Sequence, residues 1–193
     1  EAIMYSISNI IVQVSINNFG VDTMAAWTAY SKIDFIFWMI NSAFGISVMT
    51  FVGQNYGAGK WDRIRRGTKI CLGMALISAV SVSIILMSAE RFLFGIFVND
   101  VGVVEIGIRM MNVIAPAYLL FAFIEVFSGA LRAQGAVVVS TLITMVGMIW
   151  VTLVAAHGTL EQVIICYPIT WAAGALAMSI YYIYKQRKIF QAR

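Results

Sequence analysis

The sequence predicts an all-α membrane protein with six transmembrane helices. Of its 193 residues, 61% are hydrophobic and only 11% are charged, and the mean hydropathy is +0.88. Soluble domains average about 45–50% apolar and about 25% charged residues. A soluble fold of this composition would have too little polar surface to cover itself, whereas lipid accepts apolar side chains on the outside of a protein.

The length of the apolar runs supports the same fold class. A membrane-spanning helix needs about 20 mostly apolar residues, whereas the strands of a membrane barrel alternate over about 10. The runs in this chain are long and do not alternate. They predict six helices, over residues 2–19, 23–52, 70–89, 104–131, 137–156 and 161–184. Pro116 and Pro168 fall inside the fourth and sixth, and each should loosen or kink its helix because proline lacks a backbone donor.

The first predicted helix is short for a bilayer. The chain begins with Glu1, and about 18 residues precede the Asn18-Phe19-Gly20 break. About 17 helical residues cover roughly 25 Å, slightly less than the hydrocarbon core. We therefore expect residues 1–193 to form a single six-helix bundle from a longer protein, with the start of its first helix cut off.

The basic residues collect on one side of the predicted bundle. The net charge is +4. Under the six-helix topology, ten of the thirteen Lys and Arg residues lie on one side and one lies in the opposite connections. The positive-inside rule then places loop 53–69 and the C-terminus in the cytoplasm. We expect a multi-pass protein of the plasma (inner) membrane. These charges therefore do not require a nucleic acid as partner.

The first helix carries a row of amides. Asn9, Gln13 and Asn17 recur every four residues, so they share one helical face. A lipid-facing amide would lack partners, so this face is expected to point at protein or water. Contact with a neighbouring helix and the wall of a cavity both remain possible interpretations.

Ionisable residues inside the second and fourth helices are the strongest candidates for function. Lys32 and Asp34 lie on the outer half of the second helix, and their spacing points them to different faces. A charge at this depth costs about 2.5–3.5 kcal/mol on insertion scales, so it is a functional candidate by default. Tyr30 adds a polar group to the same helix. Glu125 could take up a proton or hold sodium near the cytoplasmic end of the fourth helix, or it could pair with Arg132.

Enzyme chemistry finds no support in the sequence. The residues from Gly53 to Lys60 resemble a phosphate-binding loop, but the glycine spacing is wrong and Trp61 replaces the required Ser or Thr. The chain has one histidine and two cysteines, both cysteines within apolar runs. We therefore expect no enzymatic activity, no metal site and no cofactor beyond a coupling proton or sodium ion.

Three sequence motifs indicate a family. The segment Phe51-Val52-Gly53-Gln54-Asn55-Tyr56-Gly57-Ala58-Gly59-Lys60, followed by Arg63, resembles the glycine-glutamine-asparagine signature of multidrug and toxic compound extrusion (MATE) transporters. Leu131-Arg132-Ala133-Gln134-Gly135 is similar to a second motif of that family, with Ala133 in place of its usual glycine. Ala29-Tyr30-Ser31-Lys32-Ile33-Asp34 also resembles the second helix of the C-terminal half in bacterial members.

The resemblance implies that this chain is the C-terminal lobe of a twelve-helix, two-lobe transporter whose N-terminal lobe is missing from it. Such proteins export organic cations and other xenobiotics by alternating access, in exchange for protons or sodium. Asp34 is the first candidate for the coupling carboxylate and Glu125 the second. The motif residues Gly53, Gln54, Asn55, Gly57, Gly59 and Arg63 are expected to serve structure or gating. The three glycines of this motif should let the backbone turn sharply and let helices approach closely.

Two other functions remain open from the sequence. A flippase for lipid-linked glycans would need several cations in its cavity to bind a pyrophosphate, and Lys32 is the one good candidate. A non-transporting remnant or assembly domain is the other alternative, because a single six-helix lobe lacks the second wall that alternating access requires.

Overall fold

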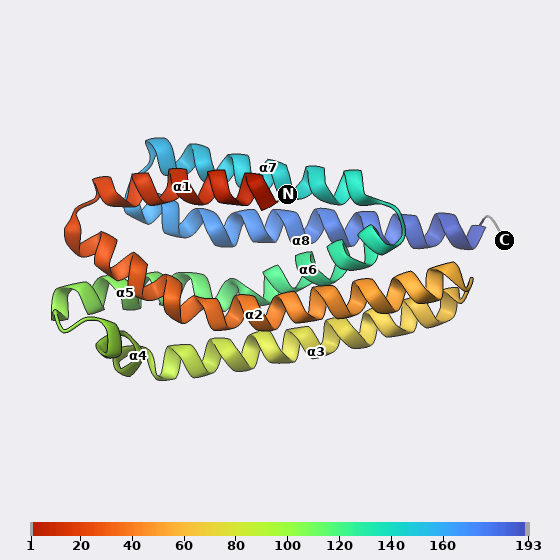
Figure 1. The fold of residues 1–193 in the computed structure, drawn as a ribbon, viewed down its shortest axis with the longest axis horizontal. Helices are drawn as coiled ribbons and strands as arrows, with labels where there is room; N and C mark the ends of the chain where they lie inside the picture. The colour runs from red at the N-terminus through yellow and green to blue at the C-terminus, as the bar shows by residue number, and fades with distance from the viewer. Residues whose placement is uncertain (1, 192–193) are drawn as a thin grey trace.

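The computed structural model describes residues 2–191, and within them it contains helices joined by short connections and no β-strand. The predicted all-α membrane fold is confirmed, and Figure 1 shows the long helices running alongside one another. In chain order the elements are α1 (Ala2–Asn18), α2 (Val21–Gly57), α3 (Trp61–Ser88), α4 (Glu90–Phe97), α5 (Val101–Ile114), the 3-10 turn η1 (Ala115–Ala117), α6 (Tyr118–Ala133), α7 (Val137–His157) and α8 (Leu160–Gln191).

Five segments of the described chain are long and apolar enough to cross a membrane: Val21–Gly57, Trp61–Ser88, Val101–Ala133, Val137–His157 and Leu160–Ile189. The sixth predicted helix is α1, which has 17 residues. The six apolar runs of the sequence therefore correspond to α1, α2, α3, α5 with α6, α7 and α8. The short helix α4 was not predicted.

The turns divide between the two ends of the bundle. In Figure 1 the α2–α3 turn, the α6–α7 turn and the end of α8 lie on the right, and the other connections lie on the left. We call the right-hand end the basic end. The helix ends that meet there carry Lys60, Arg63, Arg65, Arg66, Lys69, Arg132, Lys185, Arg187 and Lys188, whereas Arg193 lies outside the described residues.

The polar stretch 53–69 is mostly helical and is not the long loop that its composition predicted. Helix α2 continues to Gly57 and α3 begins at Trp61, so three residues form the turn. Among them Gly59 has φ 66°, a left-handed conformation that favours glycine. Helix α2 has 37 residues, or about 55 Å, and so it extends well beyond an apolar core of about 30 Å. The polar residues of stretch 53–69 therefore indicate where α2 and α3 extend beyond the apolar core of the membrane.

Pro116 interrupts the fourth span as predicted. It lies in the 3-10 turn η1, between α5 and α6. The Oγ atom of Ser83 on α3 donates a hydrogen bond of 2.9 Å to the carbonyl oxygen of Ala115, and so it supports the turn from outside. Helix α8, by contrast, continues through Pro168 without a comparable 3-10 turn.

Two hydrophobic cores hold the bundle together. The larger core involves α2 to α6 together with α8, and includes fully buried Phe37, Tyr118 and Met178. A smaller core packs α1 against α7 and the start of α8, through Val12, Ile16, Val151, Ala155, Val163 and Cys166. The α1–α7 pair is therefore packed as a unit of its own beside the main core.

Glycines bring α2 and α6 close together. A Cβ atom placed on Gly129 of α6 would lie 2.7 Å from the carbonyl oxygen of Gly45 on α2, which is too close for any side chain. Gly53 and Gly57 are helical, and a Cβ atom at either position would find space. The expectation that these two motif glycines provide sharp turns or close helix contacts was therefore wrong, and Gly45 and Gly129 provide the close contact.

Candidate transport site

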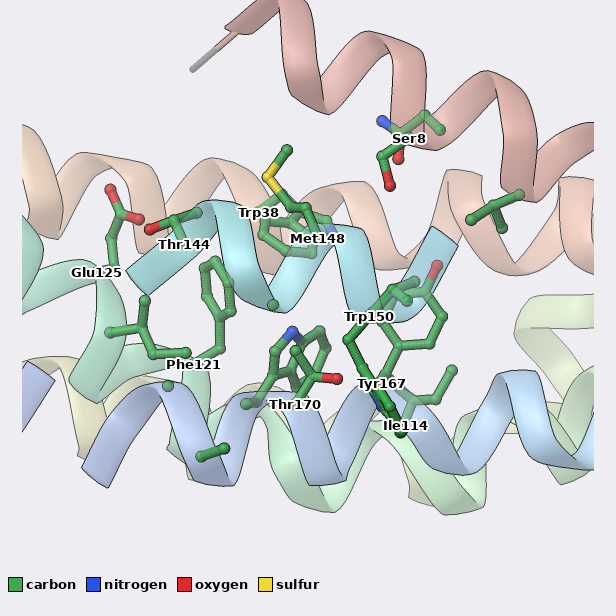
Figure 2. Close-up of a pocket in the computed structure, with 18 of the residues that line it drawn as sticks. Ser8, Trp38, Ile114, Phe121, Glu125, Thr144, Met148, Trp150, Tyr167 and Thr170 are labelled. Atoms are coloured by element: carbon green, nitrogen blue, oxygen red, sulfur yellow. The ribbon is translucent and has the colours of Figure 1, made fainter. Parts of the chain in front are cut away.

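A cavity of about 1360 Å³ opens between the α1–α7 pair and the helices α2, α6 and α8. Five predicted site residues line it: Asn9, Gln13, Tyr30, Asp34 and Glu125. Figure 2 shows side chains from several helices, among them Trp38, Phe121 and Tyr167, gathered around this space with Glu125 towards one end. The structure therefore brings together residues that are more than 100 positions apart in the chain.

Asp34 is buried at the wall of this cavity, with 8% of its surface exposed. The Oη atom of Tyr118 donates a hydrogen bond to Oδ1 of Asp34, and Nε1 of Trp38 donates one of 2.5 Å to Oδ2. The hydroxyl of Tyr30 lies 3.2 Å from that of Tyr118, and either can donate. These donors are all neutral, so they orient the carboxylate without neutralising its charge.

The side-chain pattern of α2 explains why Asp34 faces inward. Its buried residues recur at helical spacing, so they form one face that packs on α6. Lys32 is two residues away and exposed; its Nζ atom lies 5.3 Å from the centre of the Phe97 ring on α4. The two ionisable residues point apart, as their spacing predicted, and Lys32 does not line the main cavity.

An aromatic cluster surrounds the carboxylate. The rings of Phe37 and Tyr118 are stacked at 3.9 Å, and Phe121 makes edge contacts with Trp38 at 4.6 Å and with Trp171 at 5.3 Å. Sequence reasoning missed Tyr118, Trp38 and Trp171 as site residues. The four-residue spacing from Asp34 to Trp38 could have indicated one of them. Tyr118 and Trp171 come from distant helices, and no local pattern shows that Tyr118 meets Asp34 or that Trp171 joins the rings around it.

Glu125 lies on α6 towards the basic end of the cavity. Its Oε1 atom is 3.9 Å from Nη2 of Arg132, and both side chains are about one quarter exposed. The ion pair considered from the sequence is therefore present, and both partners also line the cavity. The Glu125 carboxylate packs against the backbone of Gly45, because a Cβ atom there would overlap Oε1.

Of the two roles that the sequence left open for the amide row of α1, the structure shows the cavity wall. Asn9 and Gln13 line the cavity, and Nε2 of Gln13 donates a 3.0 Å hydrogen bond to Oδ1 of Asn17. Contact with α7 is made by Ser8, whose hydroxyl lies 2.8 Å from that of Thr152. The helix–helix contact was therefore missed by one position.

The predicted motif residues at the α2–α3 turn lie at the basic end, away from the cavity. Asn55 is buried and its Nδ2 atom donates a 2.8 Å hydrogen bond to the carbonyl oxygen of Phe51, while its own carbonyl accepts one from the backbone of Lys60. Gln54 and Arg63 are exposed. The hydrogen bonds of Asn55 therefore stabilise the α2–α3 turn. None of the predicted motif residues lines the cavity.

Comparison with known proteins identifies the family. The model of the MatE family matches residues 1–157. This chain belongs to the MatE family. Its curated relatives include the "Probable multidrug resistance protein YoeA" of Bacillus subtilis, 25% identical over 97% of this chain and 42% of that protein. Human "Multidrug and toxin extrusion protein 1" is 22% identical over 76% of this chain and 28% of the relative. The MatE relatives are named as transport proteins and not as enzymes.

Solved structures show the same fold for this MatE chain. A multidrug resistance MATE family transporter in an outward-facing conformation matches with a TM-score of 0.87 and 13% identity, over 98% of this chain and 44% of that one. A MOP superfamily transporter from Pyrococcus furiosus matches with a TM-score of 0.80 and 16% identity, over 94% and 40%. The chain thus spans less than half the length of these proteins.

Proposed function

We propose that this chain is the C-terminal lobe of a secondary antiporter that exports drugs or organic cations in exchange for protons or sodium ions. The observation that carries the proposal is Asp34, a carboxyl group buried within a membrane bundle at the wall of a cavity of about 1360 Å³. A charge at this depth is costly unless it is compensated. A proton, a sodium ion or a cationic ligand can each compensate it, and competition between them couples ion to drug.

The lining of the cavity suits organic cations. Trp27, Trp38, Phe121 and Trp171 contribute aromatic rings to the wall that also contains Asp34. Ring faces attract cations electrostatically, and more strongly where water is excluded. Broad apolar walls with a buried carboxylate favour ligands by their positive charge and aromatic character more than by one particular molecular shape.

A second lobe is expected on the outer face of α1 and α2. A smaller cavity of about 390 Å³ there is lined by Gln13, Thr28, Ser31, Lys32 and Phe35. Amide, hydroxyl and ammonium groups are costly against lipid tails. We therefore place the N-terminal lobe, or a water-filled cleft between the lobes, against this face. Rocking of the two lobes about this cleft would give alternating access.

The charge pattern supports one orientation in the plasma membrane. The helix ends at the basic end carry most of the Lys and Arg residues, and such residues are retained in the cytoplasm. We propose that the basic end, including the α2–α3 turn and the end of α8, is cytoplasmic. Glu125 then lies on the cytoplasmic side of the cavity.

The decisive experiment changes Asp34 in the full-length protein. Asp34→Asn keeps the shape of the side chain, but it cannot exchange a proton or bear charge. Its oxygen can still accept from Trp38, and its NH2 group can donate to the Tyr118 hydroxyl in place of the bond that Tyr118 now donates. In proteoliposomes, drug-dependent ion flux should fall at least tenfold while the protein elutes and unfolds as the wild type does. Asp22→Asn, an exposed change at the start of the same helix, is the matched control. Unchanged flux in Asp34→Asn would remove Asp34 from the mechanism.

The two alternatives predict different activities. A lipid-linked-glycan flippase needs several cations around a pyrophosphate, yet Arg132 is the one Lys or Arg side chain among the described residues that line the cavity. Flipping of a fluorescent lipid-linked sugar by the full-length protein, without drug-dependent ion flux, would favour the flippase. Neither activity in a folded, reconstituted protein would favour the non-transporting domain.

A further inference from the structure

The buried amide of Asn41 is not accounted for by the site described above. Asn41 lies on α2 with 3% of its surface exposed, and its Nδ2 atom has no hydrogen-bond partner among the described residues. Buried donors in native proteins are nearly always paired, either with protein atoms or with ordered water. This amide therefore indicates a binding position for an acceptor on the α2–α6 interface.

A candidate acceptor comes close to Asn41 because Gly45 lacks a side chain. Gly45 follows Asn41 by four residues, so the two positions are neighbours on one helical face, with Cβ positions about 5–6 Å apart. The Glu125 carboxylate fills the place that a side chain of Gly45 would take. Glu125 thus becomes a neighbour of Asn41 although it belongs to α6. Two polar groups at about that Cβ spacing can be bridged by a single water molecule with two hydrogen bonds.

We infer that Asn41 is a positioning residue that holds a water molecule against the Glu125 carboxylate, and that Glu125 exchanges the transported proton with this water on the cytoplasmic side of the cavity. This inference rests on the proposed antiport function with the proton as coupling ion. The water accepts a hydrogen bond from Nδ2 of Asn41 and donates one to Glu125. Together with Arg132 it orients the carboxylate.

The proton step conserves every atom. The Asp34 carboxyl releases a proton to water in the cavity, and successive waters pass protons along until the water at Asn41 receives one. That water gives one of its own protons to an oxygen of Glu125, so Asp34 loses one proton and Glu125 gains one. The eleven residues from Asp34 to Gly45 correspond to about 16 Å. A cavity of about 1360 Å³ holds several tens of waters at about 30 Å³ each, enough for this path.

Few titratable or charged groups among the described residues face the proton path from Asp34 to Glu125. Tyr30, Tyr118 and Tyr167 surround Asp34, and Arg132 is the charged side chain beside Glu125. From α3, Sγ of Cys71 lies 3.7 Å from the carbonyl oxygen of Phe44, next to Gly45. Ser42 on α2 and Ser128 on α6 add hydroxyls to the cavity wall.

The test compares four variants of the full-length transporter in proteoliposomes: Asn41→Leu, Asn41→Ser, Glu125→Gln and Asn112→Leu. Leucine removes the amide at similar volume, and serine keeps a hydroxyl with room for water. Asn112 is an exposed amide on α5 outside the cavity, and so Asn112→Leu is the matched control. Drug-dependent proton release and the drug Kd are measured for each variant. Infrared difference spectra identify the Glu125 carboxyl band as the band lost in Glu125→Gln.

We expect proton release to fall at least tenfold in Asn41→Leu and Glu125→Gln, with the drug Kd within threefold of wild type. In Asn41→Ser and Asn112→Leu, both proton release and the drug Kd should stay within threefold of the wild-type values. The frequency of the Glu125 carboxyl band should shift in Asn41→Leu and should match the wild-type frequency in Asn41→Ser. Wild-type proton release in Asn41→Leu, or a Glu125 band that does not respond to Asn41, would overturn the inference while leaving the role of Asp34 intact. Unchanged flux in Asp34→Asn would instead remove the proposed antiport step.

Discussion

The Oη atom of Tyr118 donates a hydrogen bond to the carboxylate of Asp34, and so connects α2 to the first residue of α6. Tyr118 directly follows the 3-10 turn at Pro116. The carboxylate therefore contacts the bend of the fourth span. At this bend, α5 and α6 are joined through the 3-10 turn that contains Pro116, so a change at Asp34 acts directly on the start of α6.

Removing this hydroxyl should weaken both folding and coupling. Tyr118→Phe leaves the ring stack with Phe37 but takes one donor from Asp34. A hydrogen bond to a charged group contributes about 1.5–3 kcal/mol. We expect a loss of that size in the free energy of unfolding of the full-length protein, measured by denaturant titration in detergent, together with slower drug-dependent ion flux. Tyr184→Phe, at an exposed ring, should change neither.

The close approach of α2 and α6 gives a second prediction. In Gly129→Ala the new methyl group meets the backbone of Gly45, which cannot rotate away, so we expect a destabilisation of about 1–3 kcal/mol. Gly73→Ala on α3 has open space and gains helix propensity, so its stability should be unchanged or higher by up to about 1 kcal/mol. Thermal unfolding of both variants measures the difference. Equal melting temperatures would show that the helices can separate without cost.

A contact at the basic end gives the third prediction. The Nζ atom of Lys185 on α8 donates a 2.7 Å hydrogen bond to the carbonyl oxygen of Gln134, the C-cap residue directly after α6. Nε2 of Gln186 donates one of 3.0 Å to Oε1 of the same buried glutamine. Lys185→Met should cost about 1.5–3 kcal/mol, because it leaves a helix-end carbonyl without its charged donor. Lys188→Met, which is exposed, should cost far less.

The proposed orientation can be tested by thiol labelling. Cys71 and Cys166 are first replaced by alanine, and single cysteines are introduced by Lys60→Cys at the basic end or His157→Cys at the other end. Both positions are exposed. In intact cells an impermeant maleimide should label the protein with Cys at position 157 and reach position 60 only after lysis. The reverse pattern would place the basic end outside.

The apolar runs predicted the helices well because each is long enough to cross lipid, and this requirement leaves few alternatives. Helix ends were harder to predict, since stretch 53–69 is polar and yet helical. Helix α4 escaped notice because its eight residues are too short for a span. Glu125 and Asp34 were found as charges in apolar segments. Arg132 was also considered as a partner of Glu125. Tyr118 and Gly45 were missed, because they look ordinary until two helices are placed side by side.

The separate core of the α1–α7 pair determines how the cavity can change width. Three side chains pack against both cores: Trp27, Leu160 and Tyr167. Trp27 and Leu160 belong to the helix starts at the end opposite the basic one. If the pair swings, these side chains form the pivot, and both cores keep their internal packing. The opening then grows with distance from the pivot, so the same lobe can admit ligands of different bulk from the basic end without unfolding any helix.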